Sequence, residues 1–447
     1  LGGAIAAAWR RLRGWLRALI SVALSAIYVF ATWQMLYGEP VFRRLGQGEG
    51  AAALLLASAL FYFSPWMVLS LAAGALVAVI VWIEPAMGLA LTILTAPLYM
   101  HPLSLLGKSF ALAELVLLPT LVGWGTRLVR RWRRGDGLMD PPKGDALPYL
   151  RPILIFVLLA LVTTGFAAHR RVALRELRLV VIEPLLWYLA LITLPMSKRE
   201  RWRIIDAFVL SGVMVGVVGL VQYFLLGNVI TAEGGIRRLH SVYGSPNNVG
   251  LYLGRVLPVT LAIVLWGGKS DWREFWRDRR RMGYTLALPP IGLALLLSLS
   301  KGAIIVGIPA ALFVMGMLAG PRWRRITLVA LALGLIALIP LLRTPRFAGL
   351  LDLSSGTTGF RIALWHSSWA LLRDHPWVGV GLDNFLYAYR TRYVLPTAWE
   401  EFNLSHPHNL FFDYAVRLGL GGLLVAGWFQ IAFWRWMLPL RFDANSR

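Results

Sequence analysis

The feature that most constrains this chain is a succession of apolar runs, each roughly as long as a membrane span, separated by short basic segments. A helix needs about 20 mostly apolar residues to cross a bilayer. The runs lie near 18–37, 51–83, 86–105, 110–126, 152–168, 179–195, 204–226, 246–266, 284–300, 302–319, 326–342 and 410–434. We therefore expect an all-α fold, a polytopic membrane helix bundle with about twelve transmembrane helices. Pro65 in the 51–83 run either kinks one long helix or separates two short ones.

The composition agrees with a membrane protein. Hydrophobic residues make up 58% of the chain and charged residues 15%, whereas soluble domains are about half apolar and a quarter charged. The net charge of +23 does not indicate nucleic acid, because the basic residues fall in bursts between apolar runs, as topology signals do. The chain has no cysteine, which excludes disulfides and thiolate chemistry. Since no cluster of metal ligands is visible either, we predict no cofactor and no metal.

The positions of the basic bursts predict an orientation in the membrane. From the fourth run onward every second connection is strongly basic, and such connections stay in the cytoplasm. Both termini are then cytoplasmic, and the basic start of the chain leads into a retained span, not a cleaved signal peptide. The aromatic-rich connection 343–408 faces outward. We expect it to form a large loop with short helices, within a single integral membrane domain over 1–447.

Several basic side chains remain on the predicted outer side, where they oppose the orientation signal and suggest anion binding. They are Arg170, Arg171, Arg175, Arg178, Arg237, Arg238, Lys301 and Arg361. Two alternatives stay open: the cluster from Arg170 to Arg178 could attract anionic lipid headgroups, and Arg361 could pair with Asp352 or Asp374. Arg255 and Glu183 lie within apolar runs, where ion pairing and function are both reasonable roles.

Four short segments occur in one order along the second half of the chain. They are Arg238 with Gly244-Ser245-Pro246-Asn247-Asn248, then Ser300-Lys301-Gly302, then Arg361 with Pro376-Trp377-Val378-Gly379-Val380-Gly381, and finally His408-Asn409 with Gly419 and Gly422. This order and spacing resemble the O-antigen ligases and their polymerase relatives over roughly 200–430. Two departures matter. Lys301 stands where relatives commonly carry arginine, and Arg361 is followed by Trp365 where ligases are described with Arg-x3-Leu.

The residues around His408 can also be read without the resemblance. Pro407 favours an extended conformation at His406, so His408 falls at or near a helix start. The positive end of a helix disfavours imidazolium, so the His408 ring should stay neutral and able to accept a proton. His406 is either a helper or a spectator. Gly419 and Gly422 are expected to let helices approach closely. Most tryptophans should belong to the interfacial belt, although Trp365, Trp369 and Trp399 could stack on a sugar.

The resemblance implies a glycosyltransferase of the bacterial cytoplasmic (inner) membrane. The donor would be a glycan on undecaprenyl diphosphate at the outer leaflet, and the acceptor a sugar hydroxyl of lipid A–core. His408 would be the general base, and Arg238 and Arg361 would stabilise the departing diphosphate in a metal-independent, inverting reaction. The remaining candidates for substrate binding are Arg237, Lys301, Arg175, Arg171, His406 and Asn409. The alternatives are a polysaccharide polymerase of the same superfamily, whose acceptor is another glycan, and a small-anion transporter.

Overall fold

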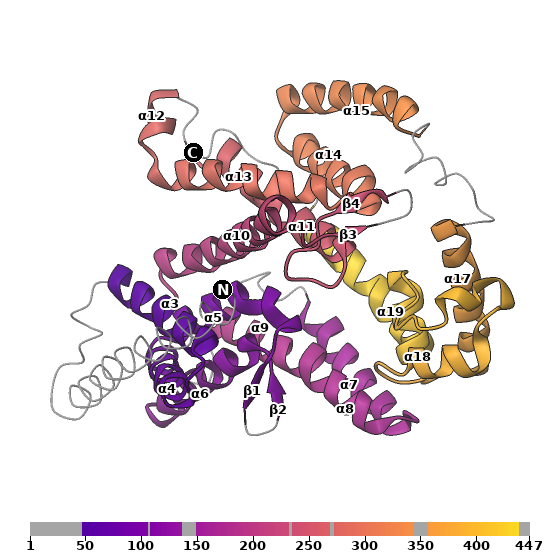
Figure 1. The fold of residues 1–447 in the computed structure, drawn as a ribbon. Helices are drawn as coiled ribbons and strands as arrows, with labels where there is room; N and C mark the ends of the chain where they lie inside the picture. Colours follow the sequence, from indigo (N-terminus) through magenta and orange to yellow (C-terminus); the bar gives the residue numbers. More distant parts are fainter. Residues whose placement is uncertain are drawn as a thin grey trace, which may run out of the picture. The chain divides into compact units, whose positions relative to one another are not determined.

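The computed structural model describes residues 47–105, 108–135, 149–231, 235–268, 272–342 and 356–437 (Figure 1). The expected span at 18–37 lies outside these residues. The chain divides into two compact units, the first containing 1–140 and 189–300 and the second 141–188 and 301–447. Each unit is described below by itself.

The first unit is built from helices that match the predicted apolar runs. They are α3 (Gln47–Phe63), α4 (Met67–Ile83), α5 (Pro85–Thr95) with the 3-10 turn η1 (Ala96–Met100), α6 (Leu112–Arg133), α10 (Lys198–Val221) with the π-helical turn η4 (Gln222–Leu226), α11 (Pro246–Trp266), α12 (Trp272–Arg277) and α13 (Arg279–Leu297). Helix α10 is central, because it packs against α5, α11 and α13.

Pro65 separates two helices. Helix α3 ends at Phe63 and α4 begins at Met67. Proline has no N–H to continue a helical ladder, and the hydroxyl of Ser64 accepts the N–H of Trp66 at 3.2 Å in the turn. The 51–83 run therefore contains two helices that pack on each other, of 17 residues each.

Two small antiparallel hairpins were not expected from the sequence. Strand β1 (Leu103–Leu105) pairs with β2 (Lys108–Phe110), and β3 (Ile230–Thr231) pairs with β4 (Arg237–Arg238). Ile230 lies opposite Arg238 in the second hairpin. This pairing places two of the predicted site arginines on one short strand between membrane helices.

The second unit contains the predicted outward connection. Its elements are α7 (Leu150–Phe166), α8 (Arg170–Glu176), the π-helical η3 (Leu177–Ile182), the start of α9 (Glu183–Thr193), η6 (Gly302–Gly307), α14 (Ile308–Leu318), α15 (Pro321–Leu342), α17 (Gly356–Asp374), α18 (Phe385–Ala388), η7 (Tyr389–Tyr393), η8 (Pro396–Glu401) and α19 (Leu410–Met437). The short helices expected in 343–408 are present as α18, η7 and η8, and α17, with 19 residues, is a long helix that was not expected.

A compact core joins α17 to the start of α19. Leu364 and Leu371 of α17 pack with Phe385, Tyr389 and Val416, all of them buried. Figure 1 shows α17 and α18 beside the first half of α19. Packing of this kind gives the segment before α19 a defined place against α17.

The fold is that of a helical membrane protein. Four described helical segments are long and apolar enough to cross a bilayer, namely Leu112–Arg133, Lys198–Leu226, Pro246–Trp266 and Leu410–Arg435. Shorter apolar helices accompany them in both units. The helical class is confirmed, while twelve spans and the single domain over 1–447 stay predictions.

Candidate functional site

The two histidines lie in a loop that ends in a helix cap. The Oδ1 atom of Asn409 accepts the N–H groups of Phe411 at 3.0 Å and Phe412 at 3.2 Å, which is the hydrogen bonding of an N-cap. Helix α19 begins at Leu410, so His408 directly precedes the cap. The expectation that His408 lies near a helix start is confirmed.

The backbone of His408 is strained. Its φ is 53°, in the left-handed region that costs a residue with a Cβ about 1–2 kcal/mol. Among the described residues, the other non-glycine positions with positive φ are Ser241, Leu299 and Asp383. Each lies within or next to one of the four sequence segments identified above. Strain of this kind gathers at functional sites, because only surrounding contacts can maintain it.

Helix α17 holds the histidine loop from one side. The indole Nε1 of Trp365 donates a hydrogen bond to the carbonyl of Pro407 at 3.1 Å, between the two histidines. The same indole stacks on Phe412, with ring centroids 6.5 Å apart. Arg361 lies one turn earlier on α17, is exposed, and adds positive charge near His408. The imidazoles of His406 and His408 are in contact, with ring centroids 4.3 Å apart.

These neighbours keep His408 neutral. Partial desolvation of the ring, together with the charges of His406 and Arg361, lowers the pKa of His408 to about 4. The predicted direction is the same, but the causes are desolvation first and then these two neighbours, where the sequence invoked the helix end. Desolvation also lowers the pKa of His406, and the carboxylate of Asp413 opposes that shift. His408 is therefore an unprotonated base at neutral pH.

Helix α19 is broken at Gly419. This glycine has φ 71° and ψ −164°, so the helical ladder is interrupted inside the predicted span. The segment Pro376–Gly381 supplies hydrogen bonds that the broken helix lacks. The N–H of Val380 donates to the carbonyl of Val416 at 2.8 Å, and the N–H of Gly381 donates to the carbonyl of Arg417 at 3.1 Å. In return the N–H of Leu420 donates to the carbonyl of Pro376 at 2.8 Å. We call Pro376–Gly381 the strap.

The glycines of the two segments allow this close approach. A Cβ on Gly419 would meet the backbone of Trp377 and Pro376, and one on Gly379, with φ 59°, would meet the backbone of Val416 and Arg417. We expected Gly419 to serve the packing of separate helices. Instead it lets the strap enter the α19 ladder, because only a residue without Cβ fits both its φ and the contact.

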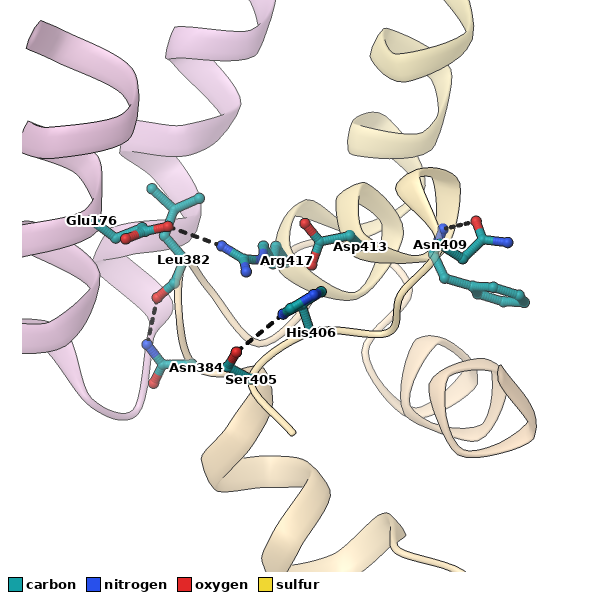
Figure 2. A network of polar contacts seen from close by, with 9 residues as sticks. Glu176, Leu382, Asn384, Ser405, His406, Asn409, Asp413 and Arg417 are labelled. Atoms are coloured by element: carbon teal, nitrogen blue, oxygen red, sulfur yellow. Dashed lines mark hydrogen bonds and ion pairs between the residues drawn. The ribbon is translucent and has the colours of Figure 1, made fainter. Parts of the chain in front are cut away.

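A network of three charges lies beside the histidine loop (Figure 2). The Nε of Arg417 contacts Asp413 Oδ1 at 2.8 Å, and its Nη1 contacts Glu176 Oε1 at 3.1 Å. The Arg417 side chain is only 16% exposed. We call Glu176, Arg417 and Asp413 the ion triad. The i,i+4 spacing of Asp413 and Arg417 on α19 suits this pair and could have predicted it. Glu176 on α8 is distant in sequence, so no local signal pointed to it.

Arg238 lies in the first unit and is held by protein acceptors. Its Nε donates to the carbonyl of Ser298 at 2.9 Å, and its Nη2 to Asn247 Oδ1 at 2.9 Å and to the carbonyl of Leu299 at 3.4 Å. The residue is 8% exposed. Arg238 thus connects the Gly244–Asn248 segment to the turn at Ser298 and Leu299 that follows α13. Arg237 differs, because it is exposed and its guanidinium lies 5.4 Å from the centroid of the Tyr223 ring.

Lys301 and the α8 arginines lie in the second unit. Lys301 is at the N-terminus of the helix formed by η6 and α14, where the helix dipole favours an anion. Arg171 and Arg175 are exposed on α8. Arg178 pairs with Glu183 at 2.9 Å, so Glu183 forms a structural ion pair. Arg255 is exposed on α11.

The pairing considered for Arg361 does not occur with Asp374. The two residues lie toward opposite ends of α17, about 20 Å apart at the rise of an α-helix. Asp374 accepts the hydroxyl of Tyr393 at 2.7 Å and lies 3.5 Å from Arg392. Asp352, the other partner considered, lies outside the described residues.

Of the predicted residues, the structure brings His406, His408, Asn409 and Arg361 together in the second unit. Arg237 and Arg238 belong to the first unit. Within the described ranges, no group of three metal-ligating side chains is close enough to hold a metal ion.

Comparison with known proteins agrees with the motifs. Residues 286–427 match a family model described as O-antigen ligase. The matched part includes Lys301, Arg361, the strap, His408 and Gly419. No curated protein matches the chain.

Proposed function

We propose that this membrane protein, whose residues 286–427 carry the O-antigen ligase family domain, is a glycosyltransferase that uses a lipid diphosphate-linked donor. The donor is a glycan on undecaprenyl diphosphate, and the acceptor is a sugar hydroxyl of lipid A–core at the outer leaflet of the inner membrane. The observation that carries the proposal is the neutral His408, held in a strained turn beside the exposed Arg361.

The chemistry needs one base and positive charge. The acceptor oxygen attacks the anomeric carbon of the donor while its proton passes to His408. The bond between that carbon and the diphosphate oxygen breaks, and the diphosphate leaves with the electron pair. Direct displacement inverts the anomeric centre. A diphosphate beside Arg361 also offsets the charge that lowers the His408 pKa, so donor binding strengthens the base.

Positive side chains stabilise the leaving diphosphate in place of a metal ion. Arg361 is exposed and adjoins His408, which suits direct contact with phosphate oxygens. Lys301 offers a point charge at a helix N-terminus, and Arg171 and Arg175 offer exposed guanidinium groups. Arg238 belongs to the first of the four sequence segments, and Arg237 is the exposed residue before it. The bonds of Arg238 to Ser298 and Leu299 suggest that it also holds the turn before Lys301.

A polymerase is the closest alternative, since it uses the same donor and differs only in the acceptor. Purified protein should therefore be given the lipid-linked glycan with either lipid A–core or a second lipid-linked glycan. Product on lipid A–core supports a ligase, and lengthened lipid-linked glycan supports a polymerase. His408→Ala should abolish the reaction, while His366→Ala, which alters an exposed histidine on α17, should retain it. No transfer to either acceptor would contradict the glycosyltransferase proposal.

The broken helix α19 gives a specific reason to consider a transporter, because broken helices often carry ion sites in membranes. The charges near this break do not fit that role. Arg417 is engaged by Asp413 and Glu176, so an anion would have to displace its two carboxylate partners. Uptake of labelled bicarbonate or phosphate into proteoliposomes tests the alternative, and uptake above protein-free vesicles would favour it.

A further inference from the structure

The two neighbouring histidines have different charged neighbours. His408 lies near the cation Arg361, whereas Figure 2 shows His406 beside Asp413 and Arg417 of α19. His406 is also hydrogen-bonded through Nδ1 to the hydroxyl of Ser405 at 3.1 Å. Arg361 thus disfavours a proton on His408. On His406 the carboxylate of Asp413 favours a proton, and it opposes the effects of desolvation and of Arg417, which lower the pKa of this ring.

The carboxylate of Asp413 is kept in place by the ion triad. Arg417 binds Asp413 along α19 and Glu176 on α8, and its side chain is largely buried. A buried arginine with two carboxylate partners holds them more firmly than an exposed pair would. Asp413 therefore cannot turn away from His406 without losing its bond to Arg417.

The histidines are held against each other. Their rings are in edge-to-face contact at 4.3 Å between centroids, and Trp365 anchors the Pro407 carbonyl that separates them. The Asn409 cap fixes the other end of the loop. This arrangement keeps the ring near Arg361 in contact with the ring near Asp413.

We propose that His406 is a second proton acceptor that takes the proton from His408 after glycan transfer, and that Asp413, held by Arg417 and Glu176, is the positioning residue for this step. The inference rests on the proposed glycosyltransferase function. His408 receives the proton of the acceptor hydroxyl and passes it to His406, which releases it to water. His408 is then neutral again for the next turnover, and no bond other than N–H is made or broken.

Histidine titration tests the positioning role without any substrate. The rate of imidazole C2–H exchange, followed by mass spectrometry of the purified full chain, reports the pKa of each histidine. Asp413→Asn should lower the pKa of His406. Glu176→Gln is the matched control, because it removes the same charge from the same triad on the side away from His406, and should lower it less. Equal shifts in the two variants would show that Asp413 has no special position.

Turnover tests the proton transfer itself. His406→Ala should lower kcat by about tenfold to a hundredfold, below the effect of removing the primary base, and leave the KM for the donor unchanged. Added imidazole should then restore kcat in a concentration-dependent way, which a structural role would not allow. Loss of kcat without rescue in both His406→Ala and His406→Gln, or full activity in both, would refute the proposal. If His408→Ala is also fully active, the proposed function itself fails.

Discussion

The N–H of Val380 donates to the carbonyl of Val416 at 2.8 Å, taking the place that the N–H of Leu420 would have in a continuous helix. The strap thereby becomes part of α19 at its break. Because the helix segment after His408 ends at this break, the strap and the histidine loop are supports of one short half-helix. Changes in the strap should therefore reach the histidines.

Gly419→Ala should destabilise the protein. The added Cβ would meet the strap backbone, and alanine disfavours the φ of 71°, so we expect a loss of about 1–3 kcal/mol. Thermal unfolding in detergent measures it. Gly427→Ala on the same helix is the control, since a Cβ there meets nothing within 4 Å and alanine favours a helix. Equal melting temperatures for the two variants would argue against the strap contact.

His408→Ala should lower turnover by about a hundredfold to ten-thousandfold, the usual contribution of a positioned base. Donor binding and membrane insertion should persist, since the His408 side chain is only partly covered by the protein. Initial rates with saturating donor measure the effect, and His366→Ala serves as the matched substitution. Near-normal turnover in His408→Ala would remove it as the base.

The pH dependence of turnover should show a different pKa of His408 in the free enzyme, reported by kcat/KM, and in the donor complex, reported by kcat. The folded-state pKa of His408 is about 4, so kcat/KM should stay level as pH falls and drop only near pH 4, where the base becomes protonated. The fall in kcat at acidic pH should occur at a higher pH than the fall in kcat/KM. The reason is that bound diphosphate offsets the charge of Arg361 and thereby raises the pKa of His408. If kcat and kcat/KM fell at the same pH, donor binding would have no effect on the pKa of His408.

Arg361→Met should weaken donor binding by about tenfold to a hundredfold, the value of a lost charge-assisted hydrogen bond. It should also raise the pKa of His408, because Arg361 is one of the charges that lower it. Donor affinity and imidazole exchange measure the two effects. Arg373→Met, at the other end of α17, should change neither. A change in affinity without any change in His408 titration would place Arg361 farther from the base.

Arg237 and Arg238 should behave differently on substitution. Arg238→Ala removes donors from the carbonyls of Ser298 and Leu299 and should lower the melting temperature, at about 1–3 kcal/mol for each buried group left unpaired. Arg237→Ala alters an exposed side chain and should leave stability unchanged while weakening donor affinity. Melting temperature and donor affinity, measured for both variants, test this difference between the two arginines. An unchanged melting temperature in Arg238→Ala would show that the hydrogen bonds of Arg238 contribute little to stability.

Turnover should survive an excess of chelator, because arginine and lysine side chains supply the positive charge for the leaving diphosphate. Rates are compared before and after treatment with EDTA, and again after magnesium or manganese is added. Loss of activity with recovery on adding either ion would show that the side chains alone do not suffice.

Local patterns in the sequence determined much of this protein. The apolar runs predicted the described α-helices other than α8, α12, α17 and α18, because a helix in a membrane must satisfy its own backbone within one continuous segment. Pro407 predicted a helix start near His408, since a proline restricts the residue before it to extended conformations. The four ordered segments predicted the match of residues 286–427 to the O-antigen ligase family model, and the position of His408 predicted a neutral ring.

Only the tertiary structure decided how these parts act on one another. Nothing near Gly419 in the sequence reveals that α19 breaks there, because the bonds that replace its ladder come from the strap. Glu176 pairs with Arg417 across more than half of the chain, and Arg238 bonds to Ser298 at the end of another helix. Such contacts depend on which side chains meet after folding, and spacing along one segment carries no record of that.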